Sequence, residues 1–420
     1  MTMPTTRTRS GAAPELKAYL RLLTATQFAF NTGFYAVLPY LAAHLGDGLG
    51  MAGWLVGLVL GLRTFSQQGL FVVGGALTDR YGPRPVVLTG CVLRIAGFCW
   101  LAQAGTTATV IGAVLLIGFA AALFSPAVES ETARAAVAHE AGTGTPRAQV
   151  LAVFSAAGQA GAFLGPLLGS LLLLLGGDFR TACLAGAVVF VGVLAGHARL
   201  MPRRPRRVRA PGARTVLPRE VFANRPFLLL CVIHSTYLVS YNQLYLALPM
   251  EVERATGSQS ALGGLFALSS LLVVVLQLPL TRWSARRIAP RTALVTGLAV
   301  VASGFAAVPL LPGGPAGLLP GAALVVLLTL GQMLLVPAAR GLVPDLVDDH
   351  RLGLATGALS SVSGLAVLVG SAATGTLLDA SGPVLWGVLT AVPLTGAALA
   401  LTLSGAGRTP GPRTDATDRP

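Results

Sequence analysis

Charged side chains are scarce in this sequence of 420 residues. Asp, Glu, Lys and Arg together make up 11% of the chain, whereas hydrophobic residues make up 54%. Soluble domains carry roughly a quarter charged residues, which cover the surface that faces water. The shortage of charge therefore excludes an ordinary soluble domain and predicts a membrane protein.

The residues that build catalytic and metal centres are also few. The four cysteines fall within apolar runs without the spacing of a metal site or a disulfide framework, and the five histidines are scattered. No phosphate-binding loop or nucleotide-binding domain is recognisable, so ATP is not expected as the direct energy source. We expect no catalytic residue, no metal, no cofactor and no enzymatic activity.

Long apolar runs are what the sequence has in abundance. A membrane-spanning helix needs about 20 mostly apolar residues. Twelve runs of this kind lie between charges or between Pro and Gly breaks. The predicted spans are 18–45, 52–77, 86–104, 107–130, 148–175, 181–199, 226–250, 259–281, 291–311, 316–339, 352–377 and 383–404.

The positions of the basic residues support this count and indicate the orientation of the chain. If the N-terminus is cytoplasmic, the cytoplasmic loops and tails hold 26 Lys and Arg, and the outer loops hold two, Arg180 and Arg254. This bias predicts that both termini are cytoplasmic. Because the charges lie in short turns and not on one face, the net charge of +14 does not indicate nucleic-acid binding.

Two halves of the chain resemble each other. PRPVVLTG at Pro83 returns as PRTALVTG at Pro290, and FSPA at Phe124 returns as LVPA at Leu335. Repeats of this kind in transporters place the substrate site between the halves, near the middle of the membrane. We therefore predict an all-α membrane protein whose twelve transmembrane helices form two pseudo-symmetric six-helix bundles.

The domain bounds follow from the repeat. The N-terminal bundle is expected over 1–199, the C-terminal bundle over 225–404, and a cytoplasmic tail, expected to be disordered, over 405–420. Between the bundles, 200–224 is a basic, proline-rich cytoplasmic linker. It is either an anchor for topology or a hinge that also holds anionic headgroups of membrane lipid.

A charged turn interrupts the apolar sequence between the second and third spans. GALTDRYGPR, from Gly75, resembles the signature loop of the major facilitator superfamily, although Pro83 stands where the family has a basic residue. The resemblance implies an inner gate, in which Asp79 lies against the positive N-terminus of span eleven near Leu352. The gate residues are Gly75, Asp79, Arg80, Gly82 and Arg84.

A glycine-rich face in span five narrows this resemblance. GQAGAFLGPLLG, from Gly158, resembles the antiporter motif of drug-exporting members, and small residues at this spacing also suit plain helix packing. RTFSQQGLFVVGGALTDRYG, from Arg63, resembles the MdtH-like group of multidrug resistance transporters. The motif residues are Gly158, Gly161, Gly165, Pro166 and Gly169.

Ionisable residues at membrane depth are functional candidates. Arg63 and Arg94 lie within spans two and three, and no acid lies at the midplane. They either make the cavity of the first half electropositive, which favours neutral or anionic amphiphiles, or bond to helix carbonyl groups. The candidates for proton coupling are Glu129, at the inner end of span four, and His234 in span seven.

Helical spacing predicts which side chains line the substrate cavity. Two polar pairs lie on single helix faces, in spans one and two, and an aromatic stripe follows span seven from His234. Aromatic stripes suit flat amphipathic ligands, and packing is the alternative. The cavity candidates are Gln27, Asn31, Arg63, Gln67, Arg94, Tyr237, Tyr241 and Tyr245.

Three functions remain open. The first is a secondary transporter that exports hydrophobic or amphipathic small molecules of several kinds in exchange for protons, by alternating access. The second is a transporter of one metabolite with the same fold, and the third is a membrane scaffold that transports nothing. The preference for Arg over Lys is associated with GC-rich bacterial genomes, so we expect a protein of the bacterial cytoplasmic membrane. The twelve runs make it a multi-pass protein, and we expect it to be a monomer.

Overall fold

The chain folds into membrane-length helices. The computed structural model describes residues 12–145, 147–202, 223–312, 317–347, 352–378 and 382–403, and every regular element within these ranges is a helix. Helices are expected because backbone groups in a membrane must form their hydrogen bonds within the protein. Most of the predicted linker and the predicted tail over 405–420 lie outside these ranges.

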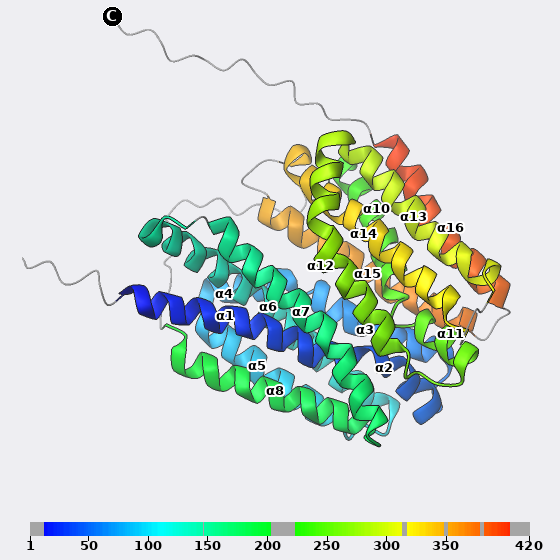
Figure 1. Cartoon of the computed structure of the whole chain (residues 1–420), viewed down its shortest axis with the longest axis horizontal. Coiled ribbons are helices and arrows are strands. Elements are labelled where there is room, and N and C mark those ends of the chain that lie inside the picture. Colours follow the sequence, from blue (N-terminus) through cyan, green and yellow to red (C-terminus); the bar gives the residue numbers. More distant parts are fainter. Residues whose placement is uncertain are drawn as a thin grey trace, which may run out of the picture.

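The first half of the chain runs from α1 to α8 and forms the left and lower part of the molecule in Figure 1. Its elements are α1 (Ala12–Tyr35), α2 (Leu38–Ala43), the π-helical turn η1 (His44–Gly48), α3 (Gly53–Gln68), α4 (Phe71–Tyr81), α5 (Pro83–Leu101), α6 (Thr107–Thr143), α7 (Arg147–Leu174) and α8 (Phe179–Leu200).

The second half runs from α10 to α16 and forms the right and upper part (Figure 1). Its helices are α10 (Arg225–Asn242), α11 (Ala247–Thr256), α12 (Leu262–Arg287), α13 (Pro290–Leu310), α14 (Leu319–Leu346), α15 (Leu352–Leu378) and α16 (Gly382–Thr402).

The number of membrane spans agrees with the sequence. Eleven helical segments of the described chain are long and apolar enough to cross a membrane, and α1 is the remaining one of twelve. Three predicted spans are interrupted: α2 follows α1, α4 follows α3, and α11 follows α10 after short turns. Pro39 and Pro249 lie near the starts of α2 and α11, where a residue without an N–H group fits the first turn.

Several helices extend past their predicted ends. The fourth span was predicted to end at residue 130, but α6 continues to Thr143, so Glu131 and Arg134 lie within a helix and not in a loop. Similarly, α12 reaches Arg287 and α14 reaches Leu346. Apolar runs report the thickness of the hydrocarbon layer, whereas a helix continues as long as its backbone hydrogen bonds and side chains allow.

The two halves repeat the same helix pairings. In the first half α1 packs on α7 and α8, α5 on α6 and α8, and α3 on α6. In the second half the corresponding pairs are α10 with α15 and α16, α13 with α14 and α16, and α12 with α14. The halves meet through α3 on α15 and through α7 on α12. These two contacts are equivalent, because each joins the second span of one half to the fifth span of the other.

A pair of arginines repeats with the fold. Arg84, the second residue of α5, donates hydrogen bonds to the carbonyl oxygens of Met201 and Ala198 at the end of α8, at 2.8 and 2.7 Å. Arg291, the second residue of α13, donates to the carbonyl oxygen of Ala400 in α16 at 3.1 Å. Each half therefore holds its last helix to its third span in the same way.

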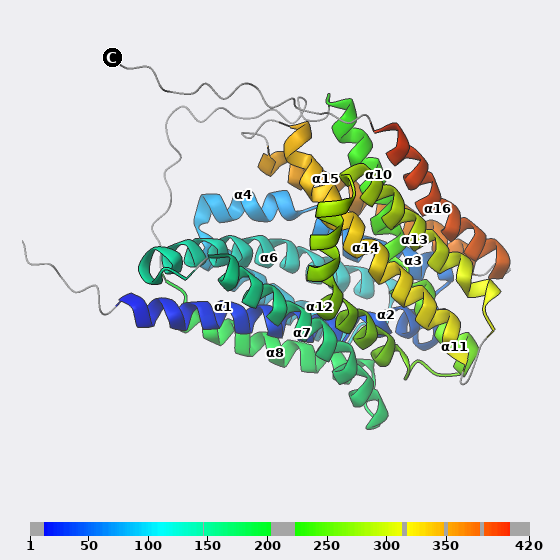
Figure 2. The same ribbon diagram turned by 45° about the horizontal axis from the view of Figure 1, so that its top comes forward.

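The interface between α3 and α15 is closest near the end of the molecule where α2 and α11 meet (Figure 2). A Cβ atom added at Gly57 would collide with the carbonyl oxygen of Ser371, and one at Gly61 would lie 2.8 Å from the Cα atom of Leu368. Glycine is required because the two backbones touch there. We call this end the α2–α11 end.

Candidate functional site

A cavity of about 100 Å³, which we call the central cavity, lies between the two halves. Helices α1 and α7 of the first half and α10, α12 and α14 of the second contribute to its walls. Hydroxyl, amide and aromatic groups dominate the lining, and none of the lining residues is charged. The lining residues are Tyr35, Gln159, Ala162, Tyr241, Tyr245, Phe266, Ser269, Ser270, Val273 and Gln332.

The stripe predicted on span seven forms a continuous ladder of rings. The centroids of His234 and Tyr237 are 5.7 Å apart, those of Tyr237 and Tyr241 5.8 Å, and those of Tyr241 and Tyr245 6.2 Å. Tyr245 then stacks on Phe266 of α12 at 5.4 Å. Two of the predicted cavity residues, Tyr241 and Tyr245, thus line the central cavity.

Hydrogen bonds fix the other end of the ladder. The hydroxyl group of Tyr237 donates to Oε1 of Gln332 on α14 at 2.9 Å, so Tyr237 positions a side chain that lines the cavity. His234 Nδ1 lies 2.9 Å from the hydroxyl oxygen of Ser363 on α15. The imidazole therefore has a fixed orientation between two helices of the second half.

The two polar candidates of α1 lie against α7. The side-chain amide of Asn31 donates to the carbonyl oxygen of Gly158 at 2.8 Å, and Gln27 lies beside the same glycine. A Cβ atom at Gly161 would collide with the carbonyl oxygen of Phe28, and one at Gly165 would lie 2.8 Å from the carbonyl oxygen of Thr32.

The rest of the span-five motif lies in this interface of α1 with α7 and in the interface of α7 with α12. A Cβ atom at Gly169 would collide with the carbonyl oxygen of Ala36, which completes a ridge along which α7 touches the backbone of α1. The carbonyl oxygen of Pro166 accepts a hydrogen bond from Tyr40 at 2.9 Å. It also faces Gly263 of α12, so the proline lies where the two halves meet.

Arg94 is enclosed within the first half. Its side chain is 1% exposed, and its guanidinium carbon lies 4.9 to 5.3 Å from the ring centroids of Phe30, Phe34, Phe98 and Phe190. One nitrogen donates to the carbonyl oxygen of Ile117 at 3.0 Å, while Nε and Nη2 have no partner among the described residues. Of the two alternatives for this residue, the contact with a helix carbonyl group is the one observed.

Arg63 is also buried, and its guanidinium carbon lies 4.4 Å from the centroid of Phe34. It donates to Oε1 of Gln67 at 2.8 Å and to the hydroxyl oxygen of Thr64 at 3.3 Å. Together with Phe34 and Phe98 it lines a second cavity of about 20 Å³, which has room for one water molecule. The predicted pair Arg63 and Gln67 thus bonds to itself.

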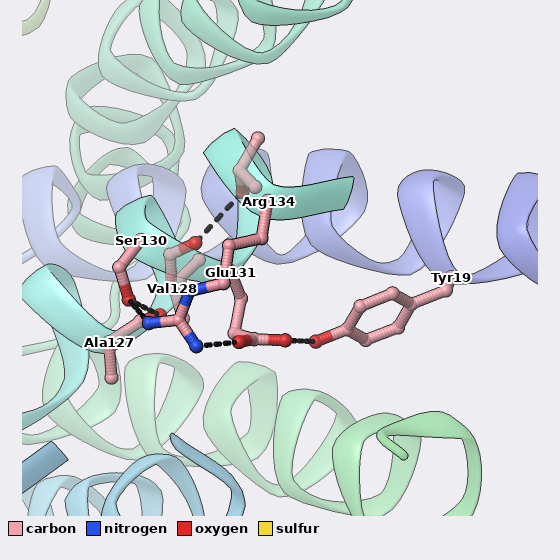
Figure 3. A network of polar contacts seen from close by, with 7 residues as sticks. Tyr19, Ala127, Val128, Ser130, Glu131 and Arg134 are labelled. Atoms are coloured by element: carbon pink, nitrogen blue, oxygen red, sulfur yellow. Dashed lines mark hydrogen bonds and ion pairs between the residues drawn. The ribbon is translucent and has the colours of Figure 1, made fainter. Parts of the chain in front are cut away.

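The two acids of α6 differ in environment. Glu131 is buried and accepts hydrogen bonds from the hydroxyl group of Tyr19 at 2.9 Å and from Arg134 at 2.8 Å (Figure 3). Glu129 is exposed, and the positive charge of Arg340, on α14 of the other half, acts on its carboxyl group. The same arginine acts on His234. Glu131 therefore fixes α6 to α1, while Glu129 faces charge from the second half.

The gate residues lie where α4 turns into α5. Gly82 ends α4 with a φ of 86°, a conformation that favours glycine, and Arg84 holds α8 as described above. Arg80 lies over the ring of Tyr81 at 5.3 Å. The side chain of Asp79 and the residues just before α15 are outside the described structure. Gly75 has open space where a Cβ atom would be.

Several residues of the central cavity were not predicted. Gln159, Ser269 and Gln332 come from three different helices, whereas Tyr35 lies four residues after Asn31 and continues its face of α1. The spacing of Gln27 and Asn31 could have found Tyr35, whereas the other three residues converge only when the helices pack. Among the described residues, no group of three or more His, Cys, Asp or Glu side chains could hold a metal ion.

Comparisons with known sequences identify relatives over most of the chain. The model of the Major Facilitator Superfamily matches residues 22–314 and 230–419. An uncharacterized MFS-type transporter of Mycobacterium tuberculosis is 38% identical over 397 residues, which cover 90% of this chain and 91% of the relative. The multidrug resistance protein MdtH of Aeromonas hydrophila is 31% identical over 341 residues, covering 79% and 83%.

Solved structures resemble the fold at low sequence identity. A mutant of the nucleoside transporter NupG superimposes with a TM-score of 0.79 at 13% identity, covering 93% of this chain and all of that one. A peptide transporter POT mutant in complex with sulfate gives a TM-score of 0.77 at 17% identity, with coverages of 91% and 93%. These similarities show the fold alone.

Proposed function

Because this chain belongs to the major facilitator superfamily, a family of membrane transporters and not of enzymes, we propose that it exports hydrophobic or amphipathic small molecules in exchange for protons. The observation that carries the proposal is the cavity between the halves, with its ladder of tyrosine rings and its uncharged lining. Aromatic rings with hydroxyl groups suit flat ligands that are partly polar. The similarity to MdtH supports export of more than one compound.

The size of the cavity supports alternating access. At about 100 Å³ it is smaller than the roughly 300 to 1,000 Å³ of ordinary ligand sites. A substrate therefore needs the halves to separate, and the contact of α3 with α15 is tight at the α2–α11 end. We assign the structure to a state that is closed at this end and would open at the other.

The orientation follows from the loop charges. We propose that both termini are cytoplasmic, in a bacterial cytoplasmic membrane, because the basic residues concentrate on the side of the termini. The α2–α11 end is then the outer end. In this orientation Asp79 and α4 lie on the inner side, where Asp79 would hold the two halves together at the start of α15. Asp79→Asn should then increase the chemical labelling of single cysteines introduced on the inner side.

Proton coupling is assigned to Glu129. Its carboxyl group is exposed, lies near the cytoplasmic half of α6, and is influenced by Arg340 from the opposite half. Protonation would remove the attraction between these two charges and so favour separation of the halves on that side. His234, which is oriented by Ser363, is the second candidate.

A transporter of one metabolite is the alternative. Gln159, Ser269 and Gln332 could recognise a specific polar molecule, because a site built from hydrogen-bonding groups rejects analogues that lack the matching group. In that case one compound would be transported, and its close analogues would not.

The deciding experiment uses purified protein in liposomes with a pH gradient and no ATP. A panel of cationic, neutral and anionic amphiphiles is followed across the membrane. Movement of several unrelated compounds, driven by the gradient, is the expected result, with a preference for neutral ones because no lining residue is charged and could pair with a charged compound. Movement of none, or of a single compound, would support the alternative.

The coupling residue is tested in the same liposomes. Glu129→Gln should abolish acceleration by the pH gradient, while exchange of substrate between the two sides continues. Glu140→Gln removes a carboxyl group from the same helix and is the matched control, which should behave like the unchanged protein. Gradient-driven transport that persists in Glu129→Gln would exclude this assignment.

A further inference from the structure

A groove of about 520 Å³ lies between α1 and α7, apart from the central cavity. It lies beside the ridge of glycines on α7. From Gly158 to Gly169 the two helices touch backbone to backbone, but the preceding turns of α7 carry the side chains of Gln149, Val153 and Ala157. The helices separate there and leave the α1–α7 groove toward the N-terminal end of α1.

The groove opens to the outside of the bundle. Val153 is 54% exposed although it lies within a membrane span. Gln159 and Ala162, which line the central cavity, lie on a different face of α7, because successive residues are turned by about 100° around a helix. Figure 1 shows α1 and α7 at the front of the first half. In a membrane, lipid must cover such a face.

The length of the groove matches one leaflet. Its α1 wall runs from Leu20 to Phe28 and its α7 wall from Gln149 to Ala157. At 1.5 Å per residue each wall is about 12 Å long, close to the roughly 15 Å of hydrocarbon in half a bilayer. The groove therefore has the extent of one acyl chain and does not cross the membrane.

Its polar end carries a positive charge. Arg21 lines the groove with the hydroxyl groups of Thr24 and Thr145 and the amide of Gln149, and no acidic side chain is part of the lining. The remaining walls are apolar. This combination of one cation with hydrogen-bond donors beside an apolar channel is complementary to a phosphate group attached to an acyl chain.

A second groove on the surface provides the contrast. It has about 280 Å³ and lies between α12 and α14, where Leu276, Pro279, Leu280, Trp283 and Leu330 line it without any charged residue. Ordinary lipid tails would fill it without preference for a headgroup. The charge at Arg21 is thus what distinguishes the α1–α7 groove.

We propose that the α1–α7 groove binds one anionic phospholipid, with its phosphate at Arg21 and one acyl chain between Phe28 and Val153. The lipid would occupy space that the glycine ridge leaves open and would hold α1 to α7 at their diverging ends. Neutral phospholipids would bind there more weakly, because zwitterionic headgroups offset the phosphate charge.

The test measures lipid retention by the full-length protein. Delipidated protein in detergent is titrated with phosphatidylglycerol or phosphatidylcholine, and bound lipid is counted by native mass spectrometry. About one phosphatidylglycerol should bind per chain in preference to phosphatidylcholine, and Arg21→Gln should weaken its binding about fivefold. Arg286→Gln, which removes an exposed arginine at the end of α12, is the control and should leave binding unchanged.

The apolar part of the groove is tested separately. Val153→Trp fills the channel from an exposed position, so the fold should tolerate it, and it should reduce phosphatidylglycerol binding although Arg21 remains. Circular dichroism and gel filtration check that each variant is folded. Equal binding of the two lipids by the unchanged protein, or an equal loss in Arg21→Gln and Arg286→Gln, would overturn the proposal.

Discussion

The two halves share their helix pairings but bury polar groups of different kinds. In the first half, Arg63 and Arg94 lie among phenylalanine rings. In the described residues of the second half no arginine or lysine is buried, and neutral groups such as Asn242, Gln243 and Ser371 bond to one another or to neighbouring helices. The shared pairings therefore do not depend on which polar groups the interior holds.

This difference separates what the fold needs from what each half adds. The repeated parts are backbone contacts and arginine anchors at helix ends, such as Arg84 and Arg291. The parts that differ are the side chains within the bundles. A duplicated architecture can thus keep its packing while one half acquires buried arginines and the other acquires a neutral, hydroxyl-rich wall facing the cavity.

The largest expected effect concerns the helix pair α1 and α7. Gly161→Ala should lower the free energy of unfolding by about 3 kcal/mol, because the new methyl group collides with a backbone carbonyl oxygen. In the corresponding pair of the second half, Gly370→Ala should cost about 1 kcal/mol, since it meets a methyl group of Val239 at 2.7 Å. Denaturant titration of both variants measures the difference.

Gly192→Ala is the control for these two substitutions, because nothing lies within 4 Å of its Cβ position. Equal destabilisation by Gly161→Ala and Gly370→Ala would mean that the backbone contact of α1 with α7 is not special to the first half.

The next effect concerns the neutral network that joins the halves. Asn242 accepts a hydrogen bond from Thr64 of α3 at 3.1 Å and donates one to Ser371 of α15 at 2.8 Å. Asn242→Leu leaves both hydroxyl groups buried without this partner and should lower stability by about 2 kcal/mol. We expect a lower melting temperature and faster chemical labelling of single cysteines introduced at the α2–α11 end. Unchanged labelling would contradict a role in closure.

A gain in stability, and not a loss, is expected when a buried charge of the first half is removed. Arg94→Met keeps the length of the side chain and removes a cation with two unpartnered nitrogens. Replacement of buried charge by apolar groups is often stabilising, so the free energy of unfolding should rise by about 1 kcal/mol. A fall in melting temperature would instead mean that the contacts with the four phenylalanine rings outweigh the cost of burial.

The smallest effects concern two carboxyl groups outside the spans. Burial, together with the negative charge of Glu253 from the other half, raises the pKa of Asp47 above its usual 3.8. Hydrogen bonds from the backbone N–H and hydroxyl group of Thr181 lower the pKa of Asp178. The stabilisation linked to Asp47 is thus present below pH 3.8 and is lost as pH rises through the raised pKa. That of Asp178 is present above pH 3.8 and is lost on acidification.

Removing the two carboxyl groups should change the melting temperature in opposite directions at neutral pH. Asp47→Asn should raise the melting temperature slightly and Asp178→Asn should lower it, and both differences should vanish in acid. Melting curves between pH 3 and pH 8 measure this. The same sign for both variants would show that contact between the halves through Asp47 and Glu253 has no influence on stability.

Parts of the site were predictable because they follow the period of one helix. Tyr237, Tyr241 and Tyr245 recur every four residues, about one helical turn, so their alignment is a property of α10 and the turn after it. Arg63 and Gln67 are four residues apart and bond to each other for the same reason. Arg94 was recognised as unusual, but its four aromatic neighbours come from α1, α5 and α8 and have no common pattern.

The sequence by itself determined the class of protein, the number of spans and the division into two halves. These depend on local quantities, namely the length of apolar runs, the sign of loop charges and the recurrence of short motifs. Only the tertiary structure decided which faces meet: that the glycines of α7 touch α1, that Tyr35, Gln159 and Gln332 enclose one cavity, and that α1 and α7 diverge into a groove. Such convergence depends on the angles and distances at which separate helices pack, and no single helix carries that information.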